Sequence, residues 1–247
     1  MNITMRYWTY IVGLAMTFSL LVSCGKDYYQ DGGVHEVNFD GTVMDFLESR
    51  PDLFDTLTTI VKLADFENTL RTEEITFFAP PNTSIRKTVN ELNQYLYISG
   101  QDTVTSPAQV DPSVWRHFLS MYVMKGKSLL KDFPQIDTLS MQAFPGQGYY
   151  SYDGEEMNIG VLYNDIRTKN SDGVEQIIRY AGYRQLYLNA YGGFSIHGLT
   201  TAPVATSDIQ PINGSVHVLQ FSKHAFGFNT IDFIQLAVAR GITYPND

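Results

Sequence analysis

Two stretches decide the fold of this 247-residue chain: Ile75-Thr76-Phe77-Phe78-Ala79-Pro80-Pro81-Asn82-Thr83-Ser84-Ile85 and Asn213-Gly214-Ser215-Val216-His217-Val218-Leu219. The first begins as a short apolar run of β-prone residues and meets two prolines, which lack the N–H that a sheet ladder needs. It therefore predicts a strand over residues 75–79. The second stretch lies in a strand predicted over residues 215–221.

Helical patterns surround the first stretch. Thr42, with Asp45 three residues later, predicts a capped short helix. Pro51 opens a longer helix, because the missing N–H of proline does no harm in a first helical turn. The predicted helices are residues 42–47, the stretch from Pro51 to Ala64, residues 82–93, the stretch from Pro112 to its end at Lys125-Gly126, and residues 230–239.

Strand patterns follow in the second half of the chain. Asp153-Gly154 is a favoured dipeptide for a tight turn, so the residues on its two sides predict a hairpin. The predicted strands are residues 149–152, 157–161, 176–180, 186–188, 194–197 and 215–221. Helices first and strands later, without βαβ alternation, indicate a single α+β domain.

The two quoted stretches together resemble the fasciclin-like domain family. The first matches the family's box in which a strand ends in Phe-Ala-Pro, one residue and then Asn, and the second matches the box with Asn-Gly and then His-Val. The segment from Phe118 to Gly126 resembles the family's Tyr-His segment, but Met121-Tyr122 stands in its place. The resemblance covers roughly residues 40–226 and implies a β-sheet wedge or sandwich packed with several helices, with an expanded segment between Ser140 and Ala202.

The amino terminus reads as an export signal. The mostly apolar run from Tyr7 to Val22 is 16 residues long, short of the roughly 20 residues that a membrane-spanning helix needs. Leu21-Val22-Ser23-Cys24-Gly25 resembles the lipobox of Bacteroidetes-type lipoproteins, in which the cysteine carries palmitate-like acyl chains. The alternative is a plain signal peptide that leaves a free thiol.

These patterns divide the chain into four parts. The expected parts are a lipoprotein signal peptide (1–23), a lipidated tether (24–39), the fasciclin-like domain (40–226), and a C-terminal helix and tail (227–247). The lipid at Cys24 predicts anchoring in the outer membrane, with display on the outer face as a further expectation.

Composition excludes several classes of protein. One cysteine cannot form an internal disulfide or a Cys-rich zinc site. The chain has 17 Lys plus Arg against 26 Asp plus Glu, and removal of residues 1–23 also removes Arg6, which leaves 16 − 26 = −10 over 247 − 23 = 224 residues. Such an acidic balance argues against a nucleic-acid partner.

No catalytic, cofactor or metal motif stands out. The five histidines form no metal-binding motif, and His217, in an apolar strand, is interpreted as a hydrogen-bonded core residue rather than a ligand. The candidate interaction residues are Tyr149, Tyr150 and Tyr152 beside the predicted turn, together with the pair Asp208-Ile209. Tyrosine offers a flat apolar face and a hydroxyl, which suits a sugar or a protein partner, although packing on sheet neighbours is the alternative. The Asp-Ile pair matches one associated with integrin attachment in animal members of the family.

The resulting functional expectation is a non-enzymatic adhesion or protein-interaction lipoprotein, bound to the membrane through its lipid and to a protein or glycan partner at its surface. The alternative is an accessory subunit that captures glycans or peptides beside a TonB-dependent importer of the outer membrane. An enzyme is the third reading.

Overall fold

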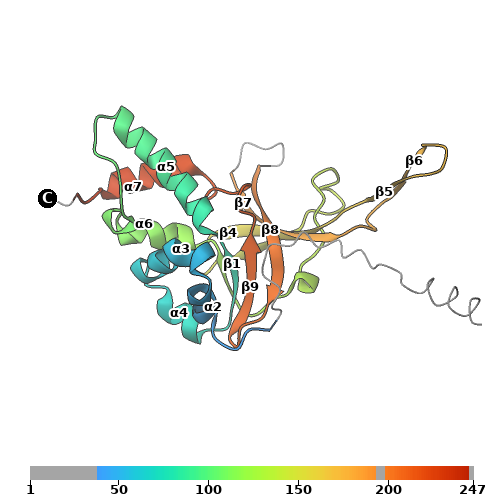
Figure 1. Ribbon diagram of the computed structural model, residues 1–247, viewed down its shortest axis with the longest axis horizontal. Coiled ribbons are helices and arrows are strands. Elements are labelled where there is room, and N and C mark those ends of the chain that lie inside the picture. Colours follow the sequence, from blue (N-terminus) through green and yellow to red (C-terminus); the bar gives the residue numbers. More distant parts are fainter. Residues whose placement is uncertain (1–37, 193–197, 245–247) are drawn as a thin grey trace, which may run out of the picture.

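The computed structural model describes residues 38–192 and 198–244, which form helices and one large sheet (Figure 1). The α-helices are α2 (Val43–Ser49), α3 (Pro51–Leu63), α4 (Glu67–Thr72), α5 (Asn82–Ile98), α6 (Pro112–Ser120) and α7 (Thr230–Arg240). Short 3-10 turns occur at Pro107–Gln109 and Leu130–Asp132. None of the helices in the described ranges is long and apolar enough to cross a membrane.

Seven strands form a mixed sheet in the order β2-β1-β9-β8-β7-β4-β3, and two more form a separate ribbon. The strands are β1 (Ile75–Ala79), β2 (Val123–Lys125), β3 (Gln147–Tyr150), β4 (Glu156–Tyr163), β5 (Ile166–Lys169), β6 (Glu175–Ile178), β7 (Arg184–Tyr191), β8 (Leu199–Ile209) and β9 (Gly214–Leu219). The expected α+β class with several helices packed on a β-sheet is therefore confirmed.

The strands of the two fold-deciding stretches are neighbours in the sheet. Strands β1 and β9 pair in parallel, with Ile75 opposite Gly214 and Ala79 opposite Val218. They are the one parallel pair among the described strands; the other pairs are antiparallel. All side chains of β1 and β9 are buried, as expected for strands covered on both faces.

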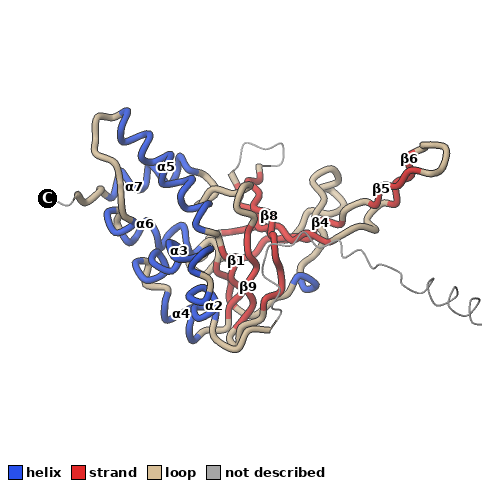
Figure 2. The backbone as a smooth tube through the Cα atoms, in the orientation of Figure 1, coloured by secondary structure: helices blue, strands red, loops and turns tan. Residues whose placement is uncertain are grey.

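The helices gather at one end of the molecule, the sheet lies in the middle, and the β5–β6 ribbon projects from the other end (Figure 2). The helix that begins at Thr42 has the expected capping box, because the amide of Thr42 donates to Asp45 Oδ2 (2.9 Å) and the amide of Asp45 donates to Thr42 Oγ1 (3.2 Å). Pro51 is the first residue of α3, also as expected.

Three sequence expectations need correction. The helix opened by Pro112 ends at Ser120 rather than at Lys125-Gly126, because Val123–Lys125 pairs with β1 as strand β2. Helix α5 continues to Ile98. Strand β8, in the middle of the sheet, had no sequence prediction at all. The strand expected over residues 194–197 lies outside the described residues. The expected signal peptide (1–23) and Cys24 also lie outside them.

The C-terminal helix α7 shares the hydrophobic core of the other helices. Its Phe233 is fully buried and packs on Trp115 (ring centroids 5.2 Å apart), Phe118 (5.1 Å) and Phe226 (6.2 Å). Since Trp115 and Phe118 belong to α6, this aromatic cluster joins α7 to the body of the domain.

Replacing Phe233 with Ala should lower the free energy of unfolding by about 3–5 kcal/mol, because it leaves a cavity among aromatic rings. Ile231→Ala is the matched control in the same helix: Ile231 is 52% exposed, and its change should stay within about 0.5 kcal/mol. Urea unfolding followed by circular dichroism measures both. Equal effects would contradict the packing of α7 described above.

Candidate interaction surface

Asn82 and Asn213, one from each fasciclin-like motif, form hydrogen bonds that link helices to the sheet. Asn82, which begins α5 directly after β1, accepts a hydrogen bond from the amide of Thr56 in α3 (3.0 Å). Asn213, just before β9, accepts from the amide of Val43 at the start of α2 (2.8 Å) and donates to the carbonyl of Leu70 (3.1 Å). These residues therefore have a structural role at the helix–sheet junctions.

His217 is a core residue whose protonation state follows from its partners. Its side chain is fully buried; Nδ1 accepts a hydrogen bond from the backbone amide of Asp208 (3.2 Å), and Nε2 lies 3.1 Å from the carbonyl oxygen of Ser128. An amide can only donate and a carbonyl can only accept, so the imidazole is neutral with its proton on Nε2. Burial lowers the pKa of His217 to about 4, although the nearby Asp208 carboxylate opposes this shift.

The pair Asp208-Ile209 is held by the fold. Asp208 lies in the left-handed backbone region (φ 65°), next to the irregular pairing of β8 with β9, and its Oδ1 accepts from the amide of Leu130 (2.7 Å). Ile209 is 1% exposed. The expected interaction role does not fit the Ile209 side chain, because a partner cannot reach it; the half-buried Asp208 carboxylate reaches solvent only in part.

The three candidate tyrosines do not form one surface. Tyr149 packs edge-on against Phe133 (5.6 Å), and Tyr152 donates to Glu73 (2.8 Å) while its ring packs on Phe66 (5.3 Å). Only Tyr150, 73% exposed, presents its ring to solvent. Alternation along β3 explains the contrast between neighbours, because Tyr149 and Tyr150 point to opposite faces of the sheet. Removing all three rings would damage packing as well as any binding surface.

A different row of tyrosines lies on one sheet face. Tyr183, just before β7, and Tyr187 and Tyr191 within it are four residues apart in turn, an even spacing that puts their side chains on one face, while Leu186 and Leu188 point to the core. The sequence contains this signal as an i, i+4, i+8 spacing, which is even and therefore keeps one face of a strand.

The β5–β6 ribbon and its turn carry four exposed apolar side chains, which are Ile166, Val174, Ile177 and Ile178. The register pairs Ile166 with Ile178 and Thr168 with Gln176, so one face of the ribbon carries these four uncharged side chains. Val174, at the tip, is 59% exposed and Ile178 is 54% exposed. We call residues 166–178 the arm. Neither strand of the arm pairs with any other strand among the described residues.

The other face of the arm carries charge. Arg167, Lys169 and Glu175 lie on it together with Ile177, which is 47% exposed, and Arg167 forms an ion pair with Glu175 (3.5 Å). All the charged side chains of the two strands therefore lie on one face, while exposed isoleucines occur on both faces. A two-stranded ribbon of this kind is marginally stable alone in water.

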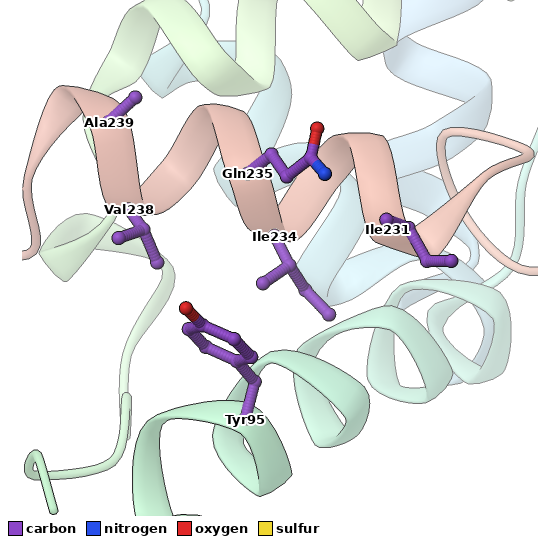
Figure 3. A pocket seen from close by; sticks show the side chains of 6 residues that line it. All are labelled: Tyr95, Ile231, Ile234, Gln235, Val238 and Ala239. Carbon is purple, nitrogen blue, oxygen red and sulfur yellow. The ribbon is translucent and has the colours of Figure 1, made fainter. Parts of the chain in front are cut away.

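An apolar groove lies at the opposite, helical end of the molecule (Figure 3). Tyr95 of α5 faces Ile234 and Val238 of α7 across it, and the groove holds about 420 Å³. Gln235 is its one polar amide, and none of its lining residues is charged.

Tyr122 and His224 form a buried polar pair that the sequence did not predict. The Tyr122 hydroxyl accepts from the amide of Gly227 (2.8 Å) and shares a hydrogen bond with Nε2 of His224 (2.6 Å). The Tyr122 ring is stacked between Phe226 and Phe228. Burial lowers the pKa of His224 to about 3, so the ring is neutral. A histidine thus meets the tyrosine of the Met121-Tyr122 segment, but it comes from a distant part of the chain.

The described ranges contain no cluster of three or more His, Cys, Asp or Glu side chains that could hold a metal ion.

Comparisons with known proteins give little sequence similarity. No protein-family model matches the chain, and no curated protein matches it. Among solved structures, a FAS1 domain pair from the insect cell adhesion molecule fasciclin I is similar, with a TM-score of 0.44 and 16% identity. The alignment covers 72% of this chain and 49% of that one, so the chain spans about half the length of that structure. The class that the geometry itself defines is a single α+β domain with a mixed sheet and a projecting arm.

The buried histidines predict loss of stability in acid. The folded-state pKa of His217 lies below its ordinary value of 6.5, so between pH 6.5 and about 4 the unfolded chain binds more protons than the folded one. Stability therefore falls as pH drops through this window, by about 3 kcal/mol from His217 alone.

His217→Asn keeps a hydrogen-bond acceptor near the amide of Asp208 but removes the titration, so its unfolding free energy should change less between pH 6.5 and 4 than that of the wild type. Urea unfolding at several pH values measures the slope. Exposed His117 on α6 supplies the control variant His117→Asn. The same flattening in both variants would refute the assignment to His217.

Proposed function

We propose that this chain is a non-enzymatic, fasciclin-like adhesion or protein-interaction module, tethered to the outer membrane by lipid at Cys24. The observation that carries the proposal is the arm. The arm holds Ile166, Ile177 and Ile178 on its strands and Val174 at its tip, all exposed, at the far end of a domain whose other large apolar side chains are mostly buried. Several exposed apolar side chains gathered on one projecting segment are typical of a contact site.

The geometry of the arm suits a protein partner. Both of its strands have free edges among the described residues, so a partner strand can add to either edge through main-chain hydrogen bonds. The exposed isoleucines then supply burial, and the charged side chains of Arg167, Lys169 and Glu175 supply orientation. The side-by-side placement of the two fasciclin-like motif strands supports the family assignment in this proposal.

A second candidate function is capture of glycans or peptides beside an outer-membrane importer. The feature that favours it is the row of Tyr183, Tyr187 and Tyr191 on the open face of β7, because such rings suit ligands with flat apolar faces.

The arm should contact its partner in cells. A photo-cross-linking benzoylphenylalanine at Val174, in the full chain expressed in the native host, should give a cross-linked adduct of discrete mass. Ile166→Thr combined with Ile178→Thr keeps β-branched residues but removes apolar area, and should lower the yield of this adduct about tenfold.

Tyr97 is the matched control position, since its side chain is 77% exposed at the opposite end of the molecule. Benzoylphenylalanine at Tyr97 should give no adduct of the same mass. The same adduct from both positions, or none from Val174, would refute the role of the arm.

The lipid anchor makes a separate prediction. Cells fed labelled palmitate should label the wild-type protein and should not label Cys24→Ala, because acylation requires the thiol. Gel fluorography of the purified protein measures this, and label that persists in the variant would refute the anchor.

A further inference from the structure

A polar hollow lies on the sheet face that carries the tyrosine row. It holds about 420 Å³, within the range of small-ligand sites. Its lining includes Tyr183, Gln185 and Tyr187 from the β7 segment, Thr201 from β8, and Gln220 and Lys223 from the segment after β9.

The register of the sheet brings these residues together. Tyr183, Gln185 and Tyr187 alternate along β7 and share its open face. Tyr187 lies opposite Pro203 of β8, and the amide of Gln220 donates to the carbonyl of Pro203 (2.8 Å). Three neighbouring segments therefore contribute side chains to one hollow.

Two of the side chains that line the hollow are held in place by hydrogen bonds within the protein. The amide Nε2 of Gln185 donates to the carbonyl of Val204 (3.3 Å), and the Tyr187 hydroxyl donates to Oε1 of Gln185 (3.3 Å). These bonds fix the Tyr187 and Gln185 side chains to β8 at the base of the hollow, so a ligand would meet a preformed surface. Preformed surfaces lose less entropy on binding.

The remaining polar groups have no partner within the described structure. The side chains of Tyr183, Thr201, Gln220 and Lys223 line the hollow, and no hydrogen bond or ion pair joins any of them to another described residue. Together they offer hydroxyl, amide and ammonium groups to a ligand.

The charge of the hollow differs from that of the whole chain. The chain carries a net charge of −9, yet the one charged residue in this lining is the cation Lys223, and no carboxylate lines the hollow. An acidic ligand would therefore meet a local positive charge. The rings of Tyr183 and Tyr187 add flat apolar faces, which stack on sugar rings.

We propose that this hollow binds a carboxylate-bearing saccharide, with a uronate carboxylate paired to Lys223 and a sugar ring stacked on Tyr183. Gln220 and Thr201 then hydrogen-bond to sugar hydroxyls. The inference deepens the second candidate function, ligand capture, and is independent of the arm.

Isothermal titration of the full domain with a trisaccharide of galacturonic acid, and with the same trisaccharide after reduction of its carboxyl groups to alcohols, tests the proposal. The acidic form should bind more tightly, and its advantage should shrink at about 1 M salt, where the screening length is about 3 Å. Lys223→Ala should weaken the acidic form about tenfold and leave the reduced form unchanged. Tyr183→Ala should weaken both forms about tenfold.

The controls carry the same residue types outside the hollow. Lys131→Ala removes another exposed lysine and Tyr97→Ala another exposed tyrosine, and neither should change binding. Circular dichroism confirms that each variant is folded. Equal binding of both trisaccharides, or equal effects of the hollow and control variants, overturns the proposal. Failure of both trisaccharides to bind, while Val174 still cross-links, overturns this inference and leaves the interaction function in place.

Discussion

The parallel pairing of β1 with β9 is the contact on which the rest of the domain depends. It needs a glycine at position 214, because a Cβ there would overlap the carbonyl oxygen of Ile75. Directly after β1, Asn82 binds the first turns of α3, and directly before β9, Asn213 binds the start of α2. One strand pair thus sets both the register of the sheet and the position of two helices, which explains why these two motifs decide the fold.

The sequence predicts best where local chemistry decides the structure. Strand β1 begins and ends where the prolines and the apolar run indicate, and the cap at Thr42 forms as expected. Strand β2 was missed because its pairing with β1 outweighs a helical pattern. Strand β8 was missed because Pro203 argues against a central strand; its carbonyl still accepts from Gln220, so the proline does not end the strand.

The surface was harder to predict because it depends on which face of each strand meets the core. Spacing alone shows that Tyr149 and Tyr150 point in opposite directions, but only the packing of Phe133 shows that Tyr149 is the inner one. The even spacing of Tyr183, Tyr187 and Tyr191, by contrast, is enough to predict that their side chains lie on one face of a strand. No local pattern could pair Tyr122 with His224, since 102 residues separate them.

The order of strands along the chain has a consequence for folding. Ile75 and its partner Gly214 are 214 − 75 = 139 residues apart, so one edge of β1 is paired only when β9, the last of the described strands, joins the sheet. Hairpins such as β3–β4 close early because their partners are near, whereas distant pairing pays a larger loop entropy and is slow. Until β9 inserts between β1 and β8, one edge of β1 has unpaired backbone N–H and C=O groups, and such an edge favours pairing with another chain.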